Sequence, residues 1–218
     1  MIRTLIADDH DILRIGLKHI LSDTEDIAVT AEASNGIEAL VELRKGTFDA
    51  LVLDLTMPGR NGIELIKQIK GEFPKLPILI LSMHKEDIYA VRSLKAGASG
   101  YLCKDSAETL LADAIRKVAD GGLFINQNVA EKLTLQILHG RDTDAPHTGL
   151  TDREHQIFLM ILQGLGVTEI GRQLNLSVKT VSTHKASILA KMNLRNSAEL
   201  VRYAIQHRLI DENDALLG

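Results

Sequence analysis

Tryptophan is absent from this chain of 218 residues, aromatic residues make up only 3 %, and Cys103 is the single cysteine. One cysteine excludes an internal disulfide and is typical of a reducing compartment. No apolar run approaches the roughly 20 residues that span a bilayer, and the N-terminus lacks the long apolar segment of a secretory signal. The sequence therefore predicts a cytoplasmic protein with aliphatic cores and no membrane partner.

The two halves of the chain differ in charge, although the net charge is only −4. Residues 1–120 contain 15 Lys and Arg against 19 Asp and Glu, whereas residues 150–210 contain 8 against 4. The length favours two domains over one. A basic second half beside an acidic first half indicates an anionic partner for the second.

Short apolar runs alternate with amphipathic stretches in the first 120 residues, a pattern typical of βα units around a parallel sheet. The predicted strands are residues 4–7, 27–33, 50–53, 78–81 and 100–102. The predicted helices are residues 12–21, 36–44, 62–72, 87–96 and 107–119. The first helix carries an apolar set at Ile12, Ile15, Leu17 and Ile20. Glycines after helical patterns predict left-handed helix ends at Gly46, Gly97 and Gly121.

The remainder of the chain has a helical pattern throughout. One helix is predicted at residues 126–138, with Val129, Leu133 and Ile137 on one face, followed by an exposed linker at residues 140–149. Four more helices are predicted at residues 151–163, 167–174, 178–192 and 197–206; Thr151 and Glu154 match a capping box at the first, and Ser177 can cap the third. The fold class is thus α/β, a doubly wound (βα)5 domain followed by an all-α four-helix domain. The predicted boundaries are 1–120 for the first domain, 121–147 for a linker with one helix and 148–214 for the second domain.

Charged and polar side chains follow four of the predicted strands, where each strand ends. They are Asp8 and Asp9, Asp54, Ser82 and Lys104. Because ligand sites of open parallel sheets form outside the carboxyl ends of the strands, these groups should share one crevice. Singly, each would be read as a turn residue or a solvated charge. Together they favour a Mg²⁺ site, with Asp54 as a nucleophile that forms an aspartyl phosphate.

The predicted helix 178–192 divides into two faces. Apolar residues expected to point inward are Val178, Val181, Ile188, Leu189 and Met192. The spacing of Lys179, Ser182, Thr183 and Ala186 predicts one outward stripe that could approach base edges. Thr180, His184 and Lys185 lie near enough to contact phosphates, as does Lys179. A plain amphipathic surface helix remains the alternative for this segment in isolation.

Residues 1 to about 120 resemble the receiver domain of two-component response regulators. The motifs are Ile6 to His10 (IADDH), Asp54 with Met57-Pro58-Gly59, Ser82, and Gly100 to Lys104 (GYLCK). The resemblance implies that a sensor histidine kinase phosphorylates Asp54. It also implies that Asp9, Asp54 and the Thr56 carbonyl bind Mg²⁺ directly, with Asp8 acting through water.

The same resemblance assigns switch roles to other residues. Ser82 and Lys104 would grip the phosphoryl group, and Tyr101 would change rotamer with Ser82. Thr56 and His84 match positions that tune dephosphorylation. Without the family, Tyr101 is a half-buried strand residue and His84 an exposed loop residue.

Residues 148 to about 210 resemble the LuxR-type helix-turn-helix, so the whole chain resembles the NarL/FixJ class of response regulators. The motifs are Leu150 to Glu154 (LTDRE), Glu169-Ile170, Leu174 to Ser177 (LNLS), Lys179 to His184 (KTVSTH), Leu189 to Met192 (LAKM) and Asn196 to Leu200 (NSAEL). Ser182, Thr183 and Ala186 would face bases, while Lys179, Thr180, His184 and Lys185 would position the DNA backbone. Gly166-Val167 and Gly171 depart from the family pattern and should loosen the second helix, because a mid-helix glycine costs about 1 kcal/mol relative to alanine. Ala186 lacks the long side chain often found at its position.

The chain is therefore expected to be a phosphorylation-controlled transcription factor, not an enzyme. Its implied partners are the kinase, double-stranded DNA and a second copy of the chain when phosphorylated, with RNA polymerase as a further candidate. One alternative is a phosphorylation-independent DNA-binding regulator whose receiver serves as a protein-interaction scaffold. Another is a Mg²⁺-dependent phosphotransferase, for which a separate acid–base residue and a substrate-binding cap are not apparent in the sequence.

Overall fold

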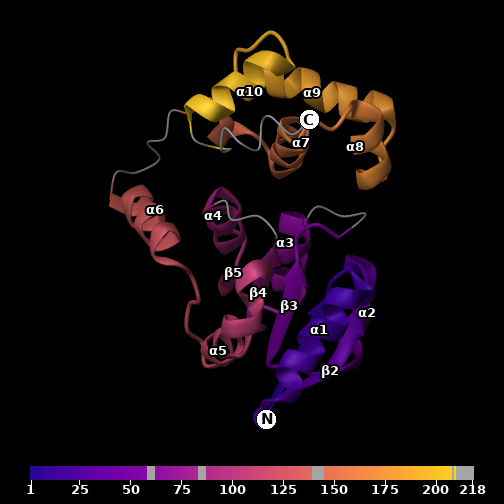
Figure 1. The fold of residues 1–218 in the computed structure, drawn as a ribbon, viewed down its shortest axis with the longest axis vertical. Coiled ribbons are helices and arrows are strands. Elements are labelled where there is room, and N and C mark those ends of the chain that lie inside the picture. The colour runs from indigo at the N-terminus through magenta and orange to yellow at the C-terminus, as the bar shows by residue number, and fades with distance from the viewer. Residues whose placement is uncertain (58–61, 83–86, 139–144, 208, 210–218) are drawn as a thin grey trace. The chain divides into compact units, whose positions relative to one another are not determined.

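The computed structural model describes residues 1–57, 62–82, 87–138, 145–207 and 209 (Figure 1). The chain divides into two compact units, Met1–Leu138 and His139–Gly218. The first unit is built around a five-stranded sheet, and the described part of the second is helical. Within the described residues, no helix is both long and apolar enough to cross a membrane.

The sheet of the first unit is parallel throughout. Its strands are β1 (Ile2–Ala7), β2 (Ile27–Ala33), β3 (Ala50–Asp54), β4 (Ile78–Ser82) and β5 (Gly100–Cys103). Every residue of β3 and β4 is buried, as expected for a strand covered on both faces. The five predicted strands are confirmed. The strand order is β2-β1-β3-β4-β5, so the chain moves outward from β1 to β2 on one side and from β3 to β5 on the other. Open parallel sheets bind ligands at such a switch point, here outside the carboxyl ends of β1 and β3.

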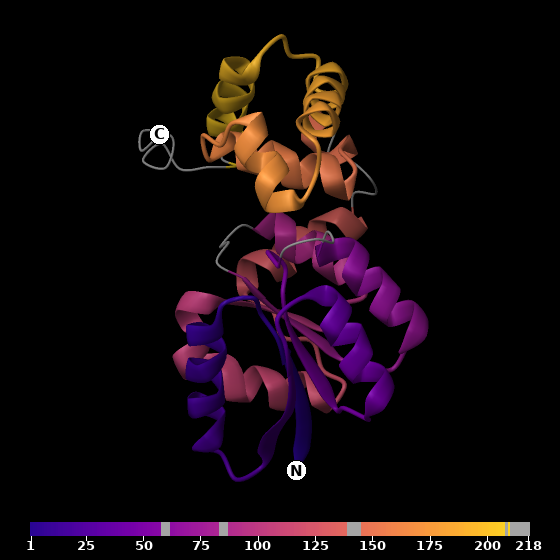
Figure 2. The same cartoon turned by 90° about the vertical axis from the view of Figure 1, so that its right-hand side faces the viewer.

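Helices cover both faces of the sheet (Figure 2). One face packs against α1 (Asp11–Ser22) and α5 (Ala107–Ala119). The other packs against α2 (Gly36–Lys45), α3 (Gly62–Glu72) and α4 (Asp87–Lys95). The two buried clusters share no residue, because side chains alternate across the sheet. The predicted doubly wound (βα)5 arrangement is confirmed.

The inward face of α1 differs from the predicted apolar set. Ile12 and Ile15 are 88 % and 66 % exposed, whereas Leu17 and Leu21 are each 1 % exposed and pack with α5. Residues four apart lie on one side of a helix, and Leu13, Leu17 and Leu21 keep that spacing. The steps of three and two residues among Ile12, Ile15 and Leu17 spread around the helix, so the prediction was wrong for both isoleucines.

Two of the three predicted left-handed glycines are confirmed. Gly97 and Gly121 have φ of 109° and 82°. Gly46 ends α2 with an N–H bond to the carbonyl of Glu42, but its φ of −138° is extended and open to any residue. The left-handed prediction for Gly46 was therefore wrong.

The segment after α5 returns along β5 before the next helix begins. The Tyr101 N–H donates to the Phe124 carbonyl at 2.8 Å, and the Phe124 N–H donates to Ser99 at 3.1 Å. The predicted helix is present as α6 (Gln127–Leu138), with Val129 1 % exposed in the cluster that contains α4. Leu133 packs partly against the same cluster, while the side chain of Ile137 lies outside the described residues. Part of the segment predicted as linker thus adds to the core of the first unit.

The second unit contains the four predicted helices. They are α7 (Asp152–Leu162), α8 (Val167–Leu174), α9 (Val178–Lys191) and α10 (Ser197–Gln206), around buried Ile157, Phe158, Ile170, Val181, Ile188 and Leu200. A short 3-10 helix, η2 (Pro146–Gly149), precedes them within the stretch predicted as exposed linker. His147 of η2 is buried, with its Nδ1 2.7 Å from the Tyr203 hydroxyl, so this part of the linker prediction was wrong.

Gly171 has a packing role that helix propensity does not reveal. A Cβ at this position would lie 2.8 Å from the carbonyl oxygen of Leu176, closer than real side chains approach backbone. The Leu176 N–H donates to the Gly171 carbonyl at 2.8 Å. The glycine therefore allows the turn between α8 and α9 to fold back tightly, a gain that offsets its low helix propensity.

Candidate functional site

The carboxyl ends of β1 and β3 hold two buried carboxylates joined by one ammonium group. Asp8 and Asp54 are each 1 % exposed, and Lys104 follows β5 with 8 % exposure. Lys104 Nζ lies 2.8 Å from Asp54 Oδ2 and 2.7 Å from Asp8 Oδ2. Residues distant in sequence are brought together because their strands end at the same edge of the sheet.

The charges of this pocket depend on one another. Burial opposes the charge of Lys104, but Asp54 and Asp8 attract the ammonium and raise its pKa above the ordinary value. Burial raises the pKa of Asp9, the nearby Asp54 and Asp8 carboxylates act in the same direction, and His10 partly opposes them. Lys104 therefore stays cationic, and a further cation would relieve the repulsion among the three carboxylates.

Thr56 holds the Asp54 carboxylate in one orientation. Its N–H donates to Asp54 Oδ1 at 3.0 Å, and its hydroxyl lies 2.8 Å from each carboxylate oxygen. With Lys104 on Oδ2, the side chain of Asp54 has fixed partners on both oxygens. A carboxylate held in one orientation is suited to attack an electrophile that is brought to it.

Ser82 and Tyr101 lie on the two strands beyond Asp54. Asp54 pairs with Leu81 in the sheet, and buried Ser82 is the next residue along β4. Tyr101 of β5 is 7 % exposed and belongs to the cluster that contains α4. The predicted residues Pro58, Gly59 and His84 lie outside the described residues.

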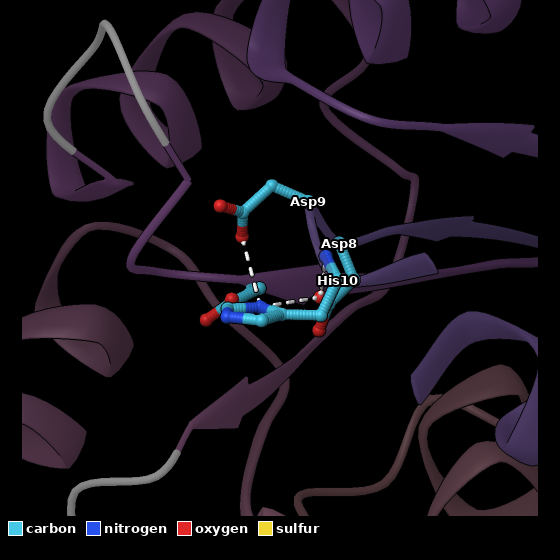
Figure 3. Close-up of side chains that lie close together, drawn as sticks. Asp8, Asp9 and His10 are labelled. Carbon is cyan, nitrogen blue, oxygen red and sulfur yellow. Dashed lines mark hydrogen bonds and ion pairs between the residues drawn. The ribbon is translucent and has the colours of Figure 1, made fainter. Parts of the chain in front are cut away.

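The pocket contains a set of atoms that fits a divalent cation. Asp8, Asp9, His10 and Asp54 each offer one ligand atom, and these atoms all lie within 4.8 Å of one another. Asp9 Oδ1 is buried and accepts no hydrogen bond within the described part of the chain, whereas Asp8 Oδ2 has Lys104 Nζ at 2.7 Å. Figure 3 shows the side chains of Asp8, Asp9 and His10 turned toward one another. Oxygen-rich sets of this kind suit Mg²⁺.

In the second unit, α9 presents a polar stripe to the surface. Lys179, Ser182, Thr183 and Ala186 are all exposed, as the helical spacing predicts. Thr180, His184 and Lys185 flank the stripe and are partly buried. The Ser177 hydroxyl accepts the Thr180 N–H at 3.0 Å, which confirms the predicted helix cap.

The predicted inward face of α9 is confirmed for Val181, Ile188 and Met192 but not for Val178. Leu189 is partly buried. Val178 is 45 % exposed because the first residue of α9 lies at the end of the helix, ahead of the turns that pack against α7 and α8. An apolar side chain therefore adds to the exposed N-terminal end of this helix.

Glu154 positions α9 on α7, a role that the sequence did not indicate. The Ser187 hydroxyl and Lys191 Nζ each donate to its carboxylate at 2.6 Å, while the Thr151 N–H donates at 2.8 Å. Burial of the carboxylate opposes its charge, but these donors prevail and lower the pKa of Glu154 to about 2. The capping box predicted from Thr151 and Glu154 is confirmed. The link to α9 joins residues 33 and 37 positions apart, a distance at which no sequence spacing signals contact.

Comparison with known proteins identifies a family for each unit. The family described as response regulator receiver domain matches residues 4–116, and the luxR family of bacterial regulatory proteins matches residues 148–204. Response regulator UvrY of Escherichia coli (strain K12) is 37 % identical over 209 residues, which cover 96 % of each chain. Oxygen regulatory protein NreC of Staphylococcus epidermidis (strain ATCC 12228) is 36 % identical, covering 96 % of this chain and 99 % of NreC.

A solved structure resembles the chain over most of its length. It is RcsB from Salmonella enterica serovar Typhimurium, bound to promoter rprA in the presence of the phosphomimetic BeF3-. RcsB is 30 % identical to this chain with a TM-score of 0.65, and the match covers 93 % of this chain and 98 % of RcsB. Sequence and structure comparisons therefore agree on both units.

Proposed function

The chain belongs to the DNA-binding two-component response regulators that join a receiver domain to a luxR-type domain, and from this premise we propose that phosphorylation of Asp54 controls its binding to DNA. The observation that carries the proposal is the position of Lys104 Nζ, within 2.8 Å of both Asp54 and Asp8 in a buried pocket. A cation so placed can neutralise a phosphoryl group on Asp54.

The proposed reaction moves one phosphoryl group. An Asp54 carboxylate oxygen attacks phosphorus of a phosphohistidine on a sensor histidine kinase, forming a P–O bond as the P–N bond breaks. The electron pair of the broken bond stays on the histidine ring, which takes up a proton. Thr56 holds Asp54 in position through its N–H and hydroxyl. Lys104 then exchanges carboxylate contacts for phosphoryl contacts, and Ser82 at the end of the neighbouring strand supplies a hydroxyl donor.

The metal proposed for this pocket is Mg²⁺, held by Asp9, Asp54 and the Thr56 carbonyl, with Asp8 acting through water. When bound, the ion would neutralise phosphoryl oxygens that the carboxylates otherwise repel. Support comes from the buried Oδ1 of Asp9, which accepts no hydrogen bond among the described residues.

The proposed output is DNA binding by a homodimer through α9. The exposed stripe of Lys179, Ser182, Thr183 and Ala186 would face the major groove, with Thr180, His184 and Lys185 near phosphates. In a dimer the two α9 helices would lie about 34 Å apart, one turn of DNA. The comparison with RcsB supports this output, because that protein was solved on a promoter with a phosphomimetic.

We would test the phosphoacceptor by intact-mass measurement after incubation with a small-molecule phosphodonor, with and without Mg²⁺. The expected result is one phosphoryl group on the wild type in Mg²⁺ and none on Asp54→Asn. Asp23→Asn, an exposed carboxylate on the same unit, is the matched control and should be modified like wild type.

Other outcomes would contradict the proposal. A phosphoryl group that persists in Asp54→Asn would place the acceptor elsewhere. No adduct, once a stable phosphoryl mimic has excluded rapid hydrolysis, would favour a receiver that acts as a partner-controlled scaffold. Repeated turnover of the donor would favour a phosphotransferase, whereas the proposal expects only slow self-hydrolysis.

A further inference from the structure

His10 occupies an unusual position for an exposed side chain. Its ring is 63 % exposed, yet Nδ1 lies 3.2 Å from Asp8 Oδ1 and 3.2 Å from Asp9 Oδ1, as the dashed lines in Figure 3 mark. His10 is the cap residue of α1, but its side chain makes no capping hydrogen bond. The ring is therefore held over the pocket by its approach to two carboxylates.

A hydrogen bond accounts for only part of this arrangement. One ring N–H can be directed well at only one of the two carboxylate oxygens. Within the described residues Asp9 Oδ1 accepts no hydrogen bond, although it is buried. One ring nitrogen that lies 3.2 Å from each of two carboxylate oxygens has instead the composition of a metal-binding set.

The distance from the ring nitrogen to each carboxylate oxygen matches the separation of two adjacent ligands on a metal ion. Zinc bonds to histidine nitrogen and carboxylate oxygen are about 2.0–2.2 Å long, so two ligands at tetrahedral angles lie roughly 3.3 Å apart. Both nitrogen–oxygen separations are 3.2 Å. Asp54 offers a fourth ligand atom within 4.8 Å of the other three.

The type of ligand atom then decides which metal ions would bind more tightly because of His10. Magnesium prefers oxygen ligands and keeps several waters, so an imidazole adds little to its affinity. Imidazole nitrogen suits zinc, cobalt and nickel, which bind nitrogen and oxygen sites more tightly than lighter divalent ions.

We infer that His10, Asp8 and Asp9 form a binding site for zinc-like divalent metals that overlaps the Mg²⁺ site. The inference rests on the proposed function, because it assigns a second type of ion to the same pocket. Asp8 can serve this ion through Oδ1 while Oδ2 stays with Lys104 at 2.7 Å. Because Asp8 and Asp9 are shared, such an ion competes with Mg²⁺ and would lower the rate at which Asp54 is phosphorylated.

Cobalt provides a spectroscopic test, because Co²⁺ takes zinc-like sites and its visible absorption reports on its ligands. We would titrate the full-length chain with Co²⁺ and compare wild type, His10→Ala and His19→Ala. His19 is the matched control, an exposed histidine on the same helix. We expect the His10→Ala change to weaken binding at least about tenfold and to alter the absorption bands, whereas His19→Ala should titrate like wild type. An excess of Mg²⁺ should displace Co²⁺ from the wild type.

Two results would overturn the inference. Equal Co²⁺ affinity and equal spectra in wild type and His10→Ala would reduce His10 to an ion-pair partner of the two carboxylates. A Co²⁺ affinity that does not change when Mg²⁺ is added would place the site elsewhere. Circular dichroism of His10→Ala verifies the fold, which an exposed ring should leave unchanged. Intact mass of wild type with phosphodonor and Mg²⁺ tests the proposed function independently, so the two failures are distinguishable.

Discussion

The carboxylate of Glu154 contributes to the stability of the C-terminal unit in a pH-dependent way. It is 5 % exposed and takes hydrogen bonds from α9 as well as from its own helix cap. Its pKa is lowered from 4.5 to about 2, because the donors outweigh the effect of burial. A pKa that is lower in the folded state means that the charge stabilises this unit above about pH 4.5. This contribution is lost as the pH falls from 4.5 toward 2.

Replacement of Glu154 by Gln should destabilise the C-terminal unit by about 1–3 kcal/mol at pH 7, because Lys191 and Ser187 lose a charged acceptor. Amide hydrogen exchange in α9 peptides of the full chain would measure the change. The variant should also lose the part of the pH dependence between about 4.5 and 2 that Glu154 supplies. Glu169→Gln is the control, since the exposed pair of Glu169 with Arg172 should contribute at most about 1 kcal/mol. Equal exchange in both variants would contradict the assigned role of Glu154.

At the scale of elements, the features that could be predicted are those whose signal lies within a few neighbouring residues. Parallel strands buried on both faces appear as apolar runs, so β3 was predicted at residues 50–53, within one residue of its observed end at Asp54. The capping box of Thr151 was also visible, because its two members lie three residues apart. The outward direction of Ile12 was not visible in the sequence. The four apolar residues of the predicted helix looked equivalent until the structure showed α5 packed on Leu17 and Leu21. The pairing of Phe124 with the edge of β5 depends on tertiary contact and has no local signal.

The contact of α6 with the receiver can be tested at Val129, which is 1 % exposed in the cluster shared with α4. Val129→Ala should cost about 1–3 kcal/mol, through lost burial and the cavity left behind. Hydrogen exchange in α6 and α4 peptides should accelerate together, because each covers the other. Asn128→Ala, at an exposed neighbouring position, should leave both peptides unchanged. Faster exchange confined to α6 would show that α4 does not depend on this contact.

At the scale of the whole molecule, the two halves of the chain have net charges of opposite sign, and each half carries a different predicted site. The acidic half carries the carboxylate pocket, and the basic half carries α9. The net charge of −4 is the sum over both halves and conceals this difference, so the charge of the whole chain gives no indication of an anionic partner. The polar residues at the strand ends lie together, and the stripe on α9 is exposed, as the sequence predicted. The sequence could not locate the contribution of Glu154, which exists only once α7 and α9 have packed.

The proposed role of the second unit predicts a specific dependence on salt. Each Lys that neutralises a DNA phosphate releases counterions, so log affinity falls with log salt by about 0.9 per contact. Lys179 is exposed at the start of α9, and a dimer would present it twice. Lys179→Ala should therefore weaken binding to specific and unrelated DNA alike and reduce the salt slope by about 1–2.

Fluorescence anisotropy over a range of salt concentrations, with phosphodonor present, would measure this slope. Lys45→Ala is the control, because it removes the same charge from the receiver, where Lys45 pairs with Glu42. If both variants changed the slope equally, the effect would come from overall charge, and Lys179 would lose its assigned place at the phosphates. If Lys179→Ala instead weakened binding to one sequence only, the residue would read base edges, and the division between base and phosphate contacts along α9 would have to be revised. A reduced slope in Lys179→Ala alone would identify the N-terminal end of α9 as the part of the chain that meets the DNA backbone.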